Sequence, residues 1–291
     1  ITSGGSAGAV NVISAPLSLN GGLTINGPGS TVASTSNNPL SITGKITPVA
    51  AGAKTIDNLS TQTVTFGAID LSTGGTGSTV TIRAGTTALA TGANSNVVLG
   101  GVIADGSTVA SNIALGARYG TTLGGSFFQI DGNNTYTGAT LVSAGTLLVT
   151  GALGNTAVTV ESGATIAGSG RFAGTLTLQD GAMLDTTAGT ITVTGLVQLG
   201  TAADHFDFGN LAGFDVNTAA PGTYTFMSGS NIDFTFVDYF GAENALALSG
   251  GRSAYFQNGS LQVVVIPEPG AALLGGIGML ALLRRRRTNL S

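Results

Sequence analysis

The fold is decided by a repeat in the middle of the sequence, which reads Val142-Ser-Ala-Gly145-Thr-Leu-Leu148, Val160-Glu-Ser-Gly163-Ala-Thr-Ile166 and Leu178-Gln-Asp-Gly181-Ala-Met-Leu184. The three segments align at a spacing of 18 residues. In each segment an aliphatic residue is followed by a glycine three positions later and by a second aliphatic residue three positions after that. A fixed short period predicts a structure built from stacked copies of one unit.

Each copy of the repeat is too short for two helices and a turn, and it is preceded by the alternation expected of a strand. Two positions before the first aliphatic residue stand Thr140, Val158 and Leu176. We therefore predict one turn of a parallel β-solenoid per repeat, in which equivalent side chains of successive turns stack ~4.8 Å apart. The alternative is a β-sandwich with evenly spaced hairpins.

The solenoid interpretation predicts two inward columns of aliphatic side chains within residues 139–200. The repeat glycines are expected in bends that need a positive φ or a close backbone approach, because glycine takes both without steric cost. The first predicted column is Val142, Val160 and Leu178, and the second is Leu148, Ile166 and Leu184.

The chain before the repeat has a similar composition and a looser periodicity. Short alternating runs at 23–25, 63–66, 79–82 and 96–99 are separated by turns rich in Gly, Ser, Thr and Asn. These runs are typical of strands. We therefore predict an all-β solenoid domain over residues 1–202, with its clearest repeat at 139–185.

One stretch of the sequence carries a family resemblance. Gly132-Asn-Asn-Thr-Tyr-Thr-Gly138-Ala-Thr-Leu-Val-Ser-Ala-Gly145-Thr-Leu-Leu148 resembles the autotransporter-associated β-strand repeat. Val102-Ile-Ala-Asp-Gly106 resembles the strand and turn that often precede it in that family. The resemblance implies a right-handed parallel β-helix of the kind found in secreted passenger domains.

Composition narrows the function classes. The 291 residues include no cysteine and one histidine, and only 8% are charged. The usual zinc sites, iron–sulfur clusters, disulfides and thiol catalysis are therefore excluded, and we expect no cofactor and no metal. Residues 1–266 carry six basic and thirteen acidic side chains. Without a basic patch to neutralise phosphates, nucleic-acid binding is disfavoured.

Residues 203–266 differ in composition from the chain before them. Eleven of the seventeen Phe and Tyr residues lie between Asp204 and Phe256. The runs at 232–237 and 261–266 predict strands, the second of them buried on both faces. Since the open edge of a solenoid must be covered, we interpret residues 203–266 as an aromatic-rich β cap. A small separate β domain is the alternative.

The last 25 residues form a distinct module. Pro267, Glu268 and Pro269 are followed by fourteen uncharged residues, 270–283, and then by four consecutive arginines. As a helix, the apolar run spans only ~21 Å against a hydrocarbon core of ~30 Å, but snorkelling basic side chains extend a short span. We predict a short transmembrane helix over 270–283. The basic membrane stop, which stays on the cytoplasmic side, is Arg284, Arg285, Arg286 and Arg287.

This tail resembles the PEP-CTERM sorting signal of Gram-negative bacteria, in which Pro-Glu-Pro precedes a short hydrophobic helix and a basic end. The resemblance implies an exosortase-type membrane protease as transient partner, removal of the tail, and delivery to the cell surface or extracellular matrix. The alternative is an ordinary permanent anchor. Any N-terminal signal peptide is expected to have been removed or to lie outside these residues.

Asp204-His205-x-Asp207 is the one cluster of carboxylates with an imidazole. Because alternate residues of a strand share a face, His205 and Asp207 can pair, but we expect a solvated turn here and no catalytic residue. The predicted function is a non-enzymatic structural or adhesive protein of a biofilm matrix that binds exopolysaccharide. The alternatives are a polysaccharide lyase or hydrolase on the same scaffold and a self-assembling surface filament subunit.

Overall fold

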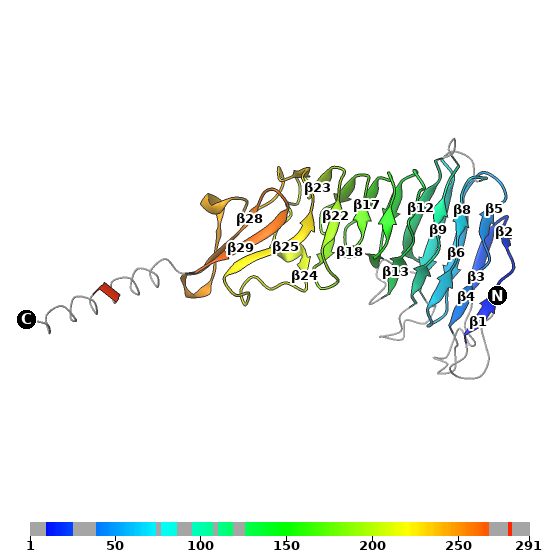
Figure 1. Ribbon diagram of the computed structural model, residues 1–291, viewed down its shortest axis with the longest axis horizontal. Helices are drawn as coiled ribbons and strands as arrows, with labels where there is room; N and C mark the ends of the chain where they lie inside the picture. The colour runs from blue at the N-terminus through cyan, green and yellow to red at the C-terminus, as the bar shows by residue number, and fades with distance from the viewer. Residues whose placement is uncertain are drawn as a thin grey trace, which may run out of the picture.

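The computed structural model describes residues 10–25, 39–73, 77–85, 95–106, 110–118, 126–267 and 279–280. This part of the chain is all-β, with long parallel sheets and very little helix. The strands lie across the long axis of an elongated molecule (Figure 1). The N-terminal strands lie at one end, and β28 (Ser253–Gln257) and β29 (Leu261–Ile266) lie toward the other.

The strands belong to four sheets, which we number 1 to 4. Sheets 1, 2 and 3 are entirely parallel. In pairing order, sheet 1 contains β1 (Asn11–Ile13), β4 (Leu40–Ile42), β7 (Val64–Phe66), β10 (Val97–Leu99), β13 (Phe127–Ile130), β15 (Thr146–Val149), β18 (Thr165–Gly168), β21 (Met183–Asp185) and β24 (Leu211–Ala212). Sheet 2 contains β2 (Leu17–Leu19), β5 (Ile46–Pro48), β8 (Ile69–Asp70) and β11 (Ile103–Ala104).

Sheet 3 has nine strands, as sheet 1 has, and the first strand of sheet 4 follows the last strand of sheet 2 along the chain. Sheet 3 contains β3 (Gly22–Ile25), β6 (Lys54–Asn58), β9 (Thr79–Ala84), β12 (Asn112–Ala117), β14 (Thr140–Val142), β17 (Val158–Val160), β20 (Leu176–Leu178), β23 (Val197–Leu199) and β26 (Ile232–Asp233). Sheet 4 contains β16 (Ala152–Leu153), β19 (Arg171–Phe172), β22 (Ile191–Val193), β25 (Gly222–Ser228), β29, β28 and β27 (Leu246–Ala247). The 3₁₀ helices are η1 (Phe208–Asn210), η2 (Ala242–Asn244) and η3 (Ser249–Gly251).

Successive strands visit the sheets in rotation. For example, β17 lies in sheet 3, β18 in sheet 1 and β19 in sheet 4, before β20 returns to sheet 3. We call three successive strands, one on each face, a rung. Each strand pairs in parallel with its equivalent in the next rung, at a spacing of ~4.8 Å. This topology is consistent with the predicted β-solenoid and excludes hairpin pairing over residues 139–200.

The first predicted column is confirmed. Val142 is opposite Val160, and Val160 is opposite Leu178. All three side chains are fully buried. They belong to one continuous cluster of aliphatic and aromatic side chains that runs through the interior between the sheets.

The second predicted column is wrong at one position. Leu147, not Leu148, is opposite Ile166, which in turn is opposite Leu184. Leu148 is half-buried and is opposite Ala167. The cause is the length of the bend, because three residues separate β14 from β15 whereas four separate β17 from β18. A shift of one residue moves a side chain to the opposite face of a strand.

The repeat glycines and the N-terminal strands agree with expectation. Gly145, Gly163 and Gly181 have φ angles of 76°, 77° and 69°. These values lie in the left-handed region that glycine occupies without the steric cost of a Cβ. The four alternating runs predicted before residue 125 coincide with β3, β7, β9 and β10.

The aromatic-rich segment first extends the parallel sheets and then departs from them. Each of β24, β25 and β26 adds one parallel strand to its sheet. After them, β29 pairs with β25 and with β28 in antiparallel fashion, and β27 pairs antiparallel with β28. Within residues 203–266 the chain thus changes from parallel to antiparallel pairing.

Two strand predictions in this segment need correction. The run at 232–237 forms a strand only over Ile232–Asp233, because the Asp233 carboxylate accepts hydrogen bonds from the backbone N–H and the hydroxyl of Thr235 and turns the chain. The run at 261–266 is a strand, but buried and half-buried residues alternate along it. Only one face of this strand is therefore fully buried, and the other face is half-buried.

The buried column supports a stability prediction. Ile166→Asp removes the ~1.5–3 kcal/mol that burial of the isoleucine contributes and places a carboxylate between two aliphatic neighbours. We expect the free energy of unfolding to fall by about 3 kcal/mol or more, as measured by urea denaturation followed by circular dichroism. Thr165→Asp, on the outward and half-buried side of the same strand, is the matched control. Equal losses in the two variants would contradict the assigned inward face.

Candidate functional site

The sequence-predicted sorting motif lies mostly beyond the described residues. Pro267 directly follows β29. Glu268, Pro269 and the four arginines 284–287 lie outside the described part of the chain. Within the predicted helix 270–283, only Met279 and Leu280 are described; both are helical and exposed. Among the described residues, no helix has the length and apolar character needed to cross a membrane.

The motif at 132–138 forms a buried polar junction between sheets 2 and 4. Asn134 is buried, and its side-chain oxygen accepts a hydrogen bond from the backbone N–H of Ile103 at 2.8 Å. Its amide nitrogen donates to the carbonyl oxygens of Gly132 and Ala152 at 2.8 and 3.1 Å. The Asn134 side chain thus forms hydrogen bonds to β11, the last strand of sheet 2, and to β16, the first strand of sheet 4. It joins the two sheets at the point where no strand lies between them. Sequence reasoning identified the motif by resemblance but did not assign this role.

Tyr136 belongs to the same junction. Its ring is fully buried, and its hydroxyl lies 2.6 Å from the Thr140 hydroxyl, which in turn lies 3.1 Å from that of Thr156. The Thr156 hydroxyl donates to the Gly138 carbonyl oxygen at 2.5 Å. Burial raises the pKa of Tyr136 to about 12, so the phenol is neutral at physiological pH. These residues connect two rungs and serve the fold.

The outer face of sheet 3 carries a polar column over its last four strands, β17, β20, β23 and β26. Thr159 is opposite Thr177, Thr177 is opposite Gln198, and Gln198 is opposite Asp233. The Thr177 hydroxyl donates to the Gln198 side-chain oxygen at 3.3 Å. The side chains are exposed or half-buried. Neighbouring residues of the column are one strand spacing apart, ~4.8 Å. The face therefore offers a regular row of hydrogen-bonding groups, of which the first three are uncharged and the last, Asp233, is a carboxylate.

The structure does not pair His205 with Asp207. Asp207 caps η1 by accepting from the backbone N–H of Gly209 at 2.7 Å. His205 instead places its Nδ1 2.8 Å from an Asp238 carboxylate oxygen, 33 residues away in sequence. Asp238 follows a turn that no local pattern connects to His205, which is why sequence reasoning missed the pair.

Most acidic side chains are held by hydrogen bonds in turns or by basic partners. Hydrogen bonds from the Ser72 hydroxyl and the Lys45 ammonium lower the pKa of Asp70 to about 2. Asp57 is buried between Arg83 and Arg118, at 2.7 and 3.2 Å. Because these carboxylates serve the fold, few are available to contact a ligand.

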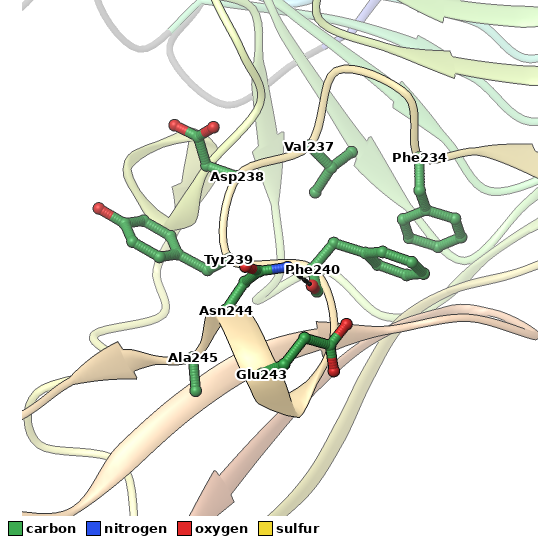
Figure 2. A pocket seen from close by; sticks show the side chains of 8 residues that line it. All are labelled: Phe234, Val237, Asp238, Tyr239, Phe240, Glu243, Asn244 and Ala245. Carbon is green, nitrogen blue, oxygen red and sulfur yellow. Dashed lines mark hydrogen bonds between the residues drawn. The ribbon is translucent and has the colours of Figure 1, made fainter.

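Beyond the last parallel strands lies a pocket of about 650 Å³. Aromatic side chains and carboxylates line it together (Figure 2). In that view the rings of Phe234 and Phe240 lie beside each other near Glu243, while the Asp238 carboxylate and the Tyr239 hydroxyl point to the other side of the loop. The lining residues are Phe234, Val237, Asp238, Tyr239, Phe240, Glu243, Asn244 and Ala245.

The pocket loop is fixed to the neighbouring strand β28. The N–H of Phe256 donates to the Tyr239 carbonyl at 2.8 Å, and the N–H of Gly241 donates to the Phe256 carbonyl at 3.0 Å. The Asn244 side chain closes the loop by donating to the Phe240 carbonyl at 3.0 Å. The density of aromatic residues at 234–240 was visible in the sequence, but the pocket depends on this docking, which sequence reasoning did not reveal.

The residues that the structure describes contain no group of three or more His, Asp or Glu side chains placed to hold a metal ion. In comparisons with known proteins, no family model, no curated protein and no solved structure matches the chain.

The junction at Asn134 supports the next prediction. Asn134→Ala leaves the buried N–H of Ile103 without its acceptor, a loss that costs about 1–3 kcal/mol. The free energy of unfolding, measured by urea denaturation, should fall by that amount. Asn133→Ala is the matched control, because Asn133 is the adjacent residue and its side chain is exposed. If both variants unfold at the wild-type urea concentration, Asn134 does not join the sheets.

Proposed function

We propose that the chain is a non-enzymatic structural or adhesive protein that works outside the cell, bound to exopolysaccharide. The observation that carries this proposal is the polar column on sheet 3, which presents two hydroxyls and an amide on three successive strands and a carboxylate on the fourth. A polysaccharide presents hydroxyl groups at regular intervals. Many weak hydrogen bonds from one rigid face give useful affinity because the later contacts form intramolecularly.

The scaffold proposed for this role is a right-handed parallel β-helix over residues 1–202. The rotation of strands among the faces and the parallel register from rung to rung support it. The resemblance of residues 132–148 to the autotransporter-associated repeat supplies the handedness and the precedent of secreted passenger domains. A rigid rod of this kind keeps the polar column straight, so that its groups can engage one polymer together.

Residues 203–266 are proposed as the cap of this scaffold. The antiparallel strands β29, β28 and β27 follow the last parallel strand of sheet 4 and continue that sheet. Large aromatic side chains, among them Phe206 and Phe256, fill the interior where the aliphatic columns end. Such a segment limits end-to-end pairing with another chain, which disfavours the filament alternative at this end.

Residues 267–291 are proposed to direct export. The Pro-Glu-Pro motif, the short apolar run and the four arginines match the PEP-CTERM pattern, so an exosortase-type protease in the inner membrane would remove the tail. Proline at 267 and 269 removes two backbone donors and disfavours helix in the residues before each proline. An extended segment between β29 and the membrane suits a protease at the membrane surface.

The adhesive proposal is tested on the column itself. In the full chain, Thr159→Val, Thr177→Val and Gln198→Leu together remove the hydrogen-bonding groups but keep the size and strand preference of the side chains. We expect binding to an immobilised neutral exopolysaccharide to weaken at least tenfold, because each lost hydrogen bond contributes about 0.5–1.5 kcal/mol.

The control is the pair Thr146→Val and Thr165→Val, whose residues are opposite each other on the outer face of sheet 1. Sheet 1 has no comparable column, because Phe127 and Met183 flank this pair. Equal losses in the two variants would contradict a role for the sheet 3 column. Shortening of the polysaccharide during the incubation would favour the lyase or hydrolase alternative.

The sorting proposal predicts a processed protein. Cells with an exosortase system should release a form that lacks residues 270–291, as measured by mass spectrometry of the secreted material. Glu268→Ala, or replacement of the four arginines 284–287 by serine, should leave uncleaved precursor in the inner membrane. Secreted protein that still ends at Ser291 would overturn the sorting interpretation.

A further inference from the structure

We propose that the pocket at 234–245 binds an amino-sugar unit with a free amine, using Glu243 for the ammonium group and the Phe234–Phe240 pair for the ring. This inference rests on the proposed function and names the class of glycan that the protein recognises. It is drawn from three features of the pocket: a carboxylate without a partner, an aromatic surface and a rigid loop.

Of the two carboxylates that line the pocket, Asp238 faces His205, whereas the Glu243 side chain has no hydrogen bond or ion pair to the described part of the chain. Elsewhere in the cap, Asp207 caps η1 and Asp233 accepts hydrogen bonds from Thr235, while the exposed Asp204 has no described side-chain partner but lies outside the pocket. Glu243 lies on η2 at the pocket wall, and its carboxylate folds back over Gly241, where a Cβ would leave it no room. Glu243 is exposed, and Figure 2 shows its carboxylate on the same side of the loop as the Phe240 ring.

The aromatic surface is formed by the half-buried rings of Phe234 and Phe240. Their centroids are 4.7 Å apart, with an interplanar angle of 23°. Each ring of a stacked pair keeps its outer face free of the other ring, and both residues are half-buried, so part of this aromatic surface is accessible. A flat aromatic face suits the C–H face of a sugar ring, and its negative electrostatic potential also attracts a cation.

The loop that carries these groups is preorganised. Hydrogen bonds to Phe256 on both sides of Phe240, and the Asn244 bond to the Phe240 carbonyl, fix its backbone before a ligand arrives. Tyr239 is the one described non-glycine residue with a positive φ, 55°. Preorganisation reduces the entropic cost of binding.

Charge complementarity favours a cationic ligand. Residues 1–266 carry six basic and thirteen acidic side chains, a net charge of −7. Long-range attraction therefore concentrates a polymer that carries ammonium groups. An aromatic face next to an unpaired carboxylate then distinguishes a sugar with a free amine from its N-acetylated form, which has no charge at that position.

The test measures binding of the full chain to two immobilised probes, a hexamer of glucosamine and a hexamer of N-acetylglucosamine. We expect the wild type to prefer the glucosamine hexamer by about tenfold, the difference between a charge-assisted and a neutral hydrogen bond. Glu243→Gln should abolish that preference, because it removes the charge and keeps the shape. Phe240→Leu should weaken binding to both hexamers.

Glu161→Gln is the matched control, since the side chain of Glu161 is also without a described partner but the residue lies in a bend between β17 and β18. It should keep the full preference. Equal losses in the Glu161 and Glu243 variants would overturn the pocket and indicate general charge attraction. Binding of a lysine hexapeptide as tight as that of the glucosamine hexamer would overturn the assignment to a sugar.

The two proposals fail in different ways. If the wild type binds both hexamers equally and the sheet 3 variant still loses binding to neutral exopolysaccharide, the pocket inference is wrong and the adhesive function stands. If the glucosamine preference depends on Glu243 while the sheet 3 variant binds normally, the pocket is supported and the role of the column is wrong. If no glycan binds, both are overturned.

Discussion

The whole body of the molecule depends on the close approach of backbone to backbone at one corner of each rung. A Cβ on Gly132 would lie 2.5 Å from the carbonyl oxygen of Gly101 in the preceding rung, and a Cβ on Gly170 would lie 2.6 Å from that of Gly151. No other residue fits at such a distance. The close approach at this corner fixes the pairing register between successive rungs. That register places each inward side chain opposite the equivalent side chain of the next rung. Among the described glycines, some therefore serve this close spacing and others a positive φ.

The sequence allowed the repeat unit to be predicted because an inward column is a local pattern. Val142, Val160 and Leu178 recur at the period of the rung, and the bend before each strand contains glycine. The error at Leu148 has a different local cause, because the bend before the strand has three residues in one rung and four in the next. The alternation within a four-residue strand is too short to reveal that shift in the sequence. Periodicity thus predicted which strands pair, but it did not predict for every strand which side chains point inward.

Contacts between distant segments were beyond prediction. Asn134 bonds to Ile103, 31 residues before it, and His205 faces Asp238, 33 residues after it. Neither distance is the 18-residue period of the repeat. The carboxylates show the same limit, because an aspartate that holds a turn and one that faces a ligand look alike in sequence. Only the structure shows that Asp233 is engaged by Thr235, whereas Glu243 has no described partner.

The place of the pocket follows from the constraint that builds the body. Along the parallel sheets the inward side chain of each strand stacks on its equivalents in the neighbouring rungs, so a cluster of large rings within the strands would interrupt the columns. That requirement ends after β24, β25 and β26, where the next strands pair antiparallel. Among the described residues, it is there that the chain holds the stacked Phe234 and Phe240 and a non-glycine residue, Tyr239, in a left-handed conformation. In our proposal the regular face of sheet 3 therefore makes repetitive, weak contacts with a polymer, and the irregular end recognises one unit of it.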